Sequence, residues 1–367
     1  MSELVIAPQA VGRGRNLILQ YREKITALAE RWLLVGGQTS VNLVLPRLAS
    51  AGIVPVQVVT LRECTVAARQ ELGHIIPTQG IQGVLACGGG KALDAGKLTA
   101  HDHHLPSVTI PTTGATCAAW TALSNIYSPA GAFQYDVPLR HCPNLLLLDY
   151  DLVQTAPPRT LAAGIGDALA KWYEAAVSSG QSPDTCLVMA VQQARILRDI
   201  LLQKAVPALA QPGSDVWQQV VDATVLMAGL IGGVGGAQCR TVAAHAVHNG
   251  LTHWPQTHRW YHGEKVAFGI LVQLRLEEMQ GVPLAGVARA QLLTLYQQID
   301  LPCTLADLGL GDCNESELFS LAERICQPGS DIHRLPFAVT PAQLLVAMQT
   351  TTQPWAKDQV ATGVQDF

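Results

Sequence analysis

The sequence predicts a two-part protein, with a Rossmann-like α/β domain over residues 1–158 and an all-helical domain over residues 159–367. Two observations carry this prediction. Short apolar runs alternate with helical patterns until about residue 150, and a helical period dominates after the paired prolines at 157–158. A chain of 367 residues is long enough to give each domain a core of its own.

Five short apolar runs are expected to form a parallel sheet. They are continuous rather than alternating, which is typical of strands covered on both faces. Helical patterns over residues 39–52 and 62–76 lie between them. This order places ligands at the carboxyl ends of the strands, where the chain carries glycines. The expected strands cover residues 31–37, 54–60, 83–90, 107–113 and 144–151.

The second half is expected to be helical from Leu161 onward, with helices over residues 161–179, 184–206 and 214–235 before a histidine-rich segment at 243–265. No internal repeat or low-complexity stretch interrupts it. A cleft between an α/β domain and a helical domain is a natural place for a small-molecule site.

Composition excludes several classes of function. Only 14% of the residues are charged and the net charge is −4, so no basic face is available for nucleic acid or an anionic membrane. No apolar stretch reaches the roughly 20 residues that a membrane span needs, and the first residues do not resemble a signal peptide. The nine cysteines are scattered without a C-x-x-C pair, as reduced thiols are. We therefore expect a cytoplasmic location.

Two stretches after expected strands are suited to a dinucleotide. In "CGGGKALDAGK" (87–97), three glycines allow close approach to a diphosphate and a helix N-terminus offers free N–H groups. The stretch is neither a G-x-G-x-x-G fingerprint nor a Walker A loop. A plain strand-to-helix turn is the alternative, and Lys91 and Asp94, one turn apart, favour the binding site. The stretch 110–127 is rich in small hydroxyl residues, which suit a cofactor groove or an ordinary polar loop.

The segment 243–265 holds five of the eleven histidines. His245 and His248 are three residues apart and therefore share a helix face. His262 directly precedes another helical pattern. His253 and His258 fall in a polar connection with a proline, where a solvated histidine is expected. A lone helical histidine is usually structural, so the segment alone does not define a metal site.

Asp167 supplies what the histidines lack. It lies in an apolar helical stretch, where a carboxylate is costly unless it is paired or binds a metal. A helix N-cap or an ion pair with Lys171 is the alternative. With His245 and His262 it completes a set of one oxygen and two nitrogen ligands. Three protein ligands and one vacant position are typical of catalytic metal sites.

Four motifs in order, "GGGKALDAGK", "GIGDALAKWYEA", "AAHAVHNGL" and "YHGEKVAFG", resemble the glycerol dehydrogenase branch of the iron-containing (group III) alcohol dehydrogenases over essentially the whole chain. The resemblance implies a dehydroquinate synthase-like fold and an NAD(P)-dependent oxidoreductase acting on CH–OH groups. A homo-oligomer is also expected.

The resemblance also implies roles for particular residues. Asp167, His245 and His262 would bind the metal, and His248 would be a nearby imidazole that assists proton movement. The residues expected to line the cofactor groove are Gly90, Lys91, Asp94, Thr112, Thr113, Thr121, Leu123 and Tyr127.

The chain departs from the family pattern at three positions. Lys171 stands where iron-binding relatives have a fourth ligand, a histidine; an ammonium does not bind metal, so zinc is expected rather than iron. Cys117 stands where glycerol dehydrogenases have an aspartate that contacts the polyol. Gly37 replaces an acidic residue that accepts from the ribose 2′-hydroxyl and rejects a 2′-phosphate. NADPH is therefore expected as cofactor, with NADH also possible.

These departures favour the reduction of 2-oxo acids such as 2-oxoglutarate and 2-oxobutanoate, as in the hydroxycarboxylate dehydrogenases of this family. Arg240 would bind the substrate carboxylate bidentately if a helix begins near Thr241. If the helix already includes position 240, Arg240 points about 140° away from His245. The glycines before Cys239 predict no helix there. A surface arginine is the alternative.

Three other functions compete with this prediction. An NAD-dependent glycerol or polyol dehydrogenase shares the scaffold and the motifs. A lyase of the dehydroquinate synthase kind shares the fold. A catalytically inactive metal- or nucleotide-binding protein is the third, and the presence of all three candidate ligands argues against it.

Overall fold

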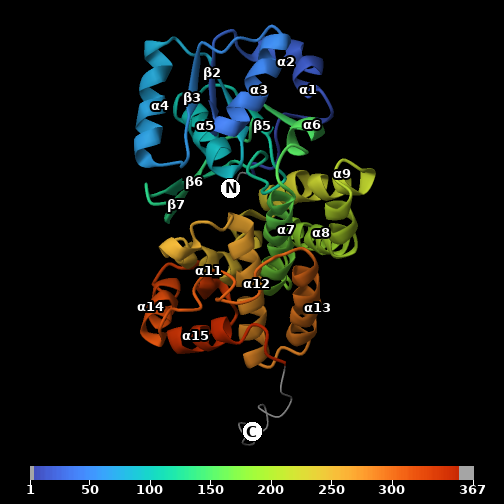
Figure 1. Ribbon diagram of the computed structural model, residues 1–367, viewed down its shortest axis with the longest axis vertical. Helices are drawn as coiled ribbons and strands as arrows, with labels where there is room; N and C mark the ends of the chain where they lie inside the picture. The colour runs from blue at the N-terminus through green and yellow to red at the C-terminus, as the bar shows by residue number, and fades with distance from the viewer. Residues whose placement is uncertain (1–3, 355–367) are drawn as a thin grey trace, which may run out of the picture.

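The computed structural model describes residues 4–354, so the outermost residues of the two expected domains lie outside it. One half of the molecule carries the parallel sheet with its covering helices, and the other half is helical (Figure 1). The last strand of the sheet ends at Asp149, and only helices and turns follow it up to residue 354. The predicted fold class is confirmed.

Six parallel strands form the sheet, in the order β1-β8-β5-β4-β2-β3. Five of them coincide with the expected apolar runs, and the sixth, β1, was missed because its sequence, AVGRG, is short and partly polar. The strands are β1 (Ala10–Gly14), β2 (Trp32–Gly36), β3 (Gln57–Thr60), β4 (Gly83–Gly88), β5 (Ser107–Pro111) and β8 (Leu145–Asp149).

Both faces of the sheet are apolar because successive side chains pack into different clusters. Leu34 of β2 packs with α1 (Leu17–Gln20), α2 (Arg22–Leu28) and α3 (Gln38–Ser50). Its neighbours Leu33 and Val35 pack with α4 (Val66–Thr78) and α5 (Gly90–Asp102) on the other face. This two-sided cover explains why the apolar runs are continuous.

An antiparallel hairpin was not predicted. It consists of β6 (Leu123–Tyr127) and β7 (Phe133–Pro138), and it lies on the side of the α/β half that faces the helices (Figure 1). The sequence of β7, FQYDVP, is half exposed and carries no apolar run, which hid the strand. The stretch at 110–127, predicted as a polar lining, therefore ends in a strand.

The helical half is built around α12 (His262–Met279), which is buried along most of its length. It packs against α7 (Pro158–Ser179) and α11 (Ala243–Leu251). Helix α7 has a proline at its first residue, where the missing N–H costs nothing. The division of the chain at residue 158 stays a prediction. The remaining helices are α6 (Tyr150–Val153), α8 (Thr185–Ala210), α9 (Asp215–Asp222), α10 (Ala228–Gly235), α13 (Ala285–Gln298), α14 (Glu315–Ile325) and α15 (Pro341–Gln349).

One helical segment corrects the sequence analysis. Residues 215–239, which comprise α9, a π-helical turn, α10 and a 3₁₀ turn, are long and apolar enough to cross a membrane, although no such stretch was expected. In the structure, 61% of the most apolar part of this segment is buried, and α9 and α10 pack against α8. Its apolar character therefore serves the core of the helical half.

Candidate metal and cofactor site

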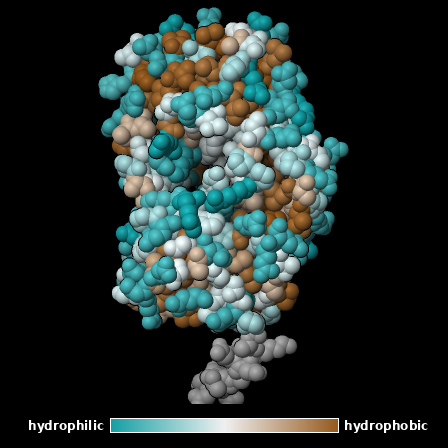
Figure 2. All heavy atoms as spheres, viewed as in Figure 1, coloured by the Kyte–Doolittle hydropathy of each residue, from teal (hydrophilic) through white to brown (hydrophobic). Residues whose placement is uncertain are grey.

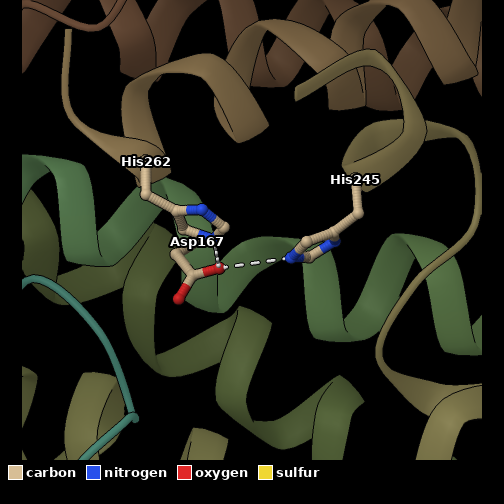
Figure 3. A group of neighbouring side chains, drawn as sticks. All are labelled: Asp167, His245 and His262. Carbon is tan, nitrogen blue, oxygen red and sulfur yellow. Dashed lines mark hydrogen bonds and ion pairs between the residues drawn. The ribbon is translucent and has the colours of Figure 1, made fainter. Parts of the chain in front are cut away.

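Three helices bring Asp167, His245 and His262 together (Figure 3). Asp167 comes from the middle of α7, His245 from the first turn of α11, and His262 is the first residue of α12. The Asp167 Oδ1 atom lies 3.2 Å from His262 Nε2 and 3.5 Å from His245 Nε2. Ligand atoms of all three lie within 4.8 Å of one another, so a single divalent ion fits among them.

Glycines allow helices α7 and α12 to approach each other this closely. A Cβ atom on Gly263 would lie 1.8 Å from the carbonyl oxygen of Ala163, and one on Gly166 would lie 2.6 Å from the carbonyl oxygen of Gly263. Helices α7 and α12 therefore touch through their backbones. Asp167, His245 and His262 are called the triad below. Gly166 precedes Asp167 and Gly263 follows His262 in the sequence, so the close contact of the two helices brings Asp167 and His262 together.

Glu174 holds His245 in place and was missed by the sequence analysis. Its Oε2 atom lies 2.5 Å from His245 Nδ1. Its Oε1 atom accepts hydrogen bonds from the backbone N–H groups of Val242 (2.7 Å) and His245 (2.9 Å), at the start of α11. Partners of this kind orient the imidazole ligand of a metal. The signal was the spacing of Asp167, Lys171 and Glu174, which places all three on one face of α7.

His248 performs a similar task for His262. The two rings are joined by a hydrogen bond of 2.9 Å between His248 Nε2 and His262 Nδ1, and the other nitrogen of His248 lies 2.9 Å from Asn249 Oδ1. Its role in proton movement stays a prediction. His253 and His258 are exposed and lie outside the triad, as expected.

Two carboxylates, Asp167 and Glu174, contact the imidazoles of the triad in a largely buried place. Burial alone would raise the pKa of the Asp167 carboxyl, but the His262 ring and hydrogen bonds from both histidines hold that pKa well below its usual range. Burial lowers the pKa of His245, yet the Glu174 carboxylate and the bond to Asp167 outweigh it and raise this pKa to about 9. For His262, burial prevails and lowers the pKa. A divalent cation would displace the proton of His245, because an imidazole binds a metal only in its neutral form.

A groove of about 830 Å³ runs from the carboxyl ends of the strands to the triad. The N-termini of α3 and α5 border it, as in other dinucleotide sites. The expected cofactor residues that line it are Gly37, Gly90, Lys91, Asp94, Thr112, Thr113 and Tyr127.

The other two expected cofactor residues, Thr121 and Leu123, do not line this groove. The buried Nζ atom of Lys97 donates to their carbonyl oxygens, at 3.0 Å and 2.5 Å respectively. Lys97 also forms an ion pair of 3.1 Å with Asp94. Thr121 and Leu123 thus anchor the hairpin to α5 and face a second cavity.

The second cavity, of about 700 Å³, contains the triad together with Cys117, Lys171 and Arg240. The two cavities meet, and the surface in Figure 2 is hollowed between the two halves of the molecule. A cofactor in the groove and a substrate in the cavity would therefore be adjacent at the triad. The residues that line both are Asp94, Thr116, Ala118, Asn125, Tyr127, His248 and His262.

Arg240 lies before α11, which begins at Ala243, so its side chain is not on that helix and reaches the cavity wall. The prediction that the glycines exclude a helix before Cys239 is wrong, because α10 continues to Gly235 and a 3₁₀ turn follows. These glycines permit close packing instead. A Cβ atom on Gly233, for example, would lie 2.2 Å from the carbonyl oxygen of Ile6.

Comparison with known proteins agrees with this arrangement. A family model described as iron-containing alcohol dehydrogenase matches residues 8–150. The chain is 55% identical to an uncharacterised oxidoreductase of Synechocystis, over 99% of this chain and 95% of that protein. It is 40% identical to hydroxycarboxylate dehydrogenase A of Escherichia coli, over 72% of this chain and 74% of that protein. The chain belongs to the iron-containing alcohol dehydrogenase family.

The fold agrees with the family assignment over nearly the whole chain. The crystal structure of glycerol dehydrogenase from Schizosaccharomyces pombe superposes with a TM-score of 0.82 at 27% identity, covering 95% of this chain and 90% of that one. The predicted family and its dehydroquinate synthase-like fold are thus confirmed. The protein is an oxidoreductase of the iron-containing alcohol dehydrogenase family that acts on the hydroxyl or carbonyl group of a small molecule.

Proposed function

We propose that this enzyme reduces 2-oxo acids, of the 2-oxoglutarate and 2-oxobutanoate type, to 2-hydroxy acids with NADPH. The observation that carries the proposal is the wall of the cavity beside the triad, where the guanidinium group of Arg240 accompanies Cys117. A guanidinium group binds carboxylates well. The thiol of Cys117 stands where glycerol dehydrogenases would have an aspartate in contact with a hydroxyl group of the polyol, so no carboxylate at that position repels an acidic substrate.

The choice of NADPH is supported by Gly37. It precedes the first turn of α3 at the border of the groove, and a Cβ atom there would meet nothing within 4 Å. Space is therefore available for a 2′-phosphate, and no carboxylate repels it. Thr39 and Arg62 line the same groove and are candidates to bind that phosphate. NADH is a possible second cofactor.

Asp167, His245 and His262 would hold the divalent metal. The fit is supported by the buried partners Glu174 and His248, which occupy the Nδ1 atoms of the two histidines and leave the Nε2 atoms near Asp167. Lys171 stands where iron-binding relatives have a fourth ligand, so a site with three protein ligands and one open position is favoured, and zinc suits such a site. When bound, the ion would polarise the substrate carbonyl group.

The chain's own residues would perform the remaining steps. The groove would hold the nicotinamide beside the residues that line both cavities, so that hydride reaches the carbonyl carbon. A relay through His248, which is buried and lines both cavities, or through water would deliver the proton to the carbonyl oxygen. A cytoplasmic, homo-oligomeric enzyme remains our expectation.

The alternative is an NAD-dependent glycerol or polyol dehydrogenase, favoured by the structural similarity to glycerol dehydrogenase. The test uses the metal-loaded enzyme with NADPH or NADH against 2-oxobutanoate and 2-oxoglutarate, and with NADP⁺ or NAD⁺ against glycerol. We expect the highest kcat/KM for NADPH with a 2-oxo acid. A higher kcat/KM for glycerol with NAD⁺ would establish the alternative.

A further inference from the structure

Lys171 is a buried cation without a partner among the described residues. Its side chain is only 4% exposed, and it lines the cavity one helical turn beyond Asp167. Within residues 4–354, its Nζ atom takes part in no hydrogen bond or ion pair, although Asp167 is near. The Asp167 carboxylate instead accepts from His245 and His262.

Lys97 shows how partners within the fold can satisfy a buried lysine. It is 2% exposed, and its Nζ atom has an ion pair with Asp94 and donates to the backbone of Thr121 and Leu123. An ammonium group removed from water without such partners is costly. Lys265 is 6% exposed and likewise has no hydrogen bond or ion pair among the described residues, and it lines the cofactor groove. The two buried lysines without a partner thus each line a cavity, where an anion from outside the chain can approach the ammonium group.

The surroundings of Lys171 place that anion next to the triad. Lys171 lines the same cavity as Asp167, His245 and His262, and it shares helix α7 with Asp167. Arg240 lines that cavity from the turn before α11, and its Nε–H group donates to the carbonyl oxygen of Gly236 at 3.2 Å. Of the two cations, Lys171 is the one on the same helix as a triad residue.

Cys117 keeps Lys171 available. The charge of Lys171 also lowers the pKa of the buried Cys117 thiol, although burial raises this pKa more. A carboxylate at position 117 would neutralise the ammonium group, whereas a protonated thiol does not.

We propose that Lys171 binds the carboxylate attached to the carbonyl carbon that is reduced, while Arg240 is left for a second carboxylate farther along the substrate. The inference rests on the proposed reduction of 2-oxo acids. It makes Lys171 the residue that selects for an acid at the position next to the reacting group.

The test compares 2-oxobutanoate with 2-oxobutanamide, in which a neutral amide of similar shape replaces the carboxylate. In Lys171→Gln we expect kcat/KM for the acid to fall about 30- to 100-fold, mainly through KM, because a charge-assisted hydrogen bond is lost. The value for the amide should change by less than about threefold. Lys171→Met is a second neutral variant, and Lys171→Arg should recover part of the preference for the acid. Arg324→Gln, an exposed change at the same cavity, is the matched control.

Binding of oxamate, an unreactive analogue of a 2-oxo acid, provides a readout without turnover. Calorimetry should show a similar loss of affinity in Lys171→Gln, with metal content and thermal unfolding as in the wild type. Equal losses for acid and amide, in a wild type that prefers the acid, would overturn the role of Lys171 and leave the proposed function standing. A wild type that neither binds oxamate nor prefers the acid would overturn both.

Discussion

The cofactor groove and the substrate cavity meet at the triad but are built in different ways. The groove is made largely of glycines, hydroxyl groups and helix N-termini at the ends of adjacent strands. The cavity is made of side chains that α7, the turn before α11 and the hairpin contribute from distant parts of the sequence. A local sequence motif therefore predicts the groove, whereas the residues that line the cavity can be identified only once the chain is folded.

The largest expected effect concerns the point where the two cavities meet. Asp167→Asn should remove nearly all bound metal and turnover, because a neutral amide replaces the only carboxylate of the triad. His253→Ala, an exposed histidine outside the triad, is the control and should keep its metal. Elemental analysis after dialysis measures both. Full metal content in Asp167→Asn would show that the ion binds elsewhere.

A smaller loss of metal affinity is expected when Glu174, which contacts His245, is changed. Glu174→Gln should weaken metal binding about 10- to 100-fold, because His245 loses the carboxylate that orients its ring. Competition with a chelator measures the affinity. Glu277→Gln changes another buried carboxyl, paired with Gln273, and should leave metal affinity unchanged. An equal loss in the two variants would indicate a general disturbance of the helical half.

On the groove side, Gly37→Asp should raise KM for NADPH about tenfold and leave KM for NADH nearly unchanged. The reason is repulsion between a carboxylate and the 2′-phosphate, on the order of a kcal/mol in a partly buried groove. Initial rates with each cofactor at saturating substrate decide it. Parallel changes for the two cofactors would mean that the 2′-phosphate lies away from position 37.

The smallest effect is a pH dependence. Burial, with a contribution from Lys91, lowers the pKa of Lys265 in the groove to about 8. Its ammonium group is charged below that pH and neutral above it, so NADPH should bind about threefold more weakly as the pH rises past 8. Fluorescence titration from about pH 6 to about pH 9.5 should give a flat profile for Lys265→Met. The same slope in that variant would assign the effect to another group.

The sequence predicted the architecture because its signals are local. Continuous apolar runs marked five of the six sheet strands, and β1 escaped because AVGRG carries too little apolar surface. Motifs likewise pointed to Asp167, His245 and His262, which the fold then brought within bonding distance of one ion.

Features that depend on packing were less visible. The glycines at 232–235 suggested that no helix precedes Cys239, but their lack of a side chain permits close contacts inside the helical half. Thr121 and Leu123 were expected to face the cofactor, but the buried Lys97 takes their carbonyl groups. The sequence shows that Lys171 stands where iron-binding relatives have a histidine ligand. Its lack of a partner depends on the side chains that the fold places around it, and the sequence does not predict these.

The short segment 258–265 contributes to the groove and also supplies His262 to the triad. During synthesis, the ribosome completes the entire sheet more than a hundred residues before this segment emerges. A nascent or truncated chain would then contain every strand of the sheet, but its dinucleotide groove would lack the residues of segment 258–265. Cofactor binding and metal binding would both have to wait for this same segment, because it completes the groove and supplies His262.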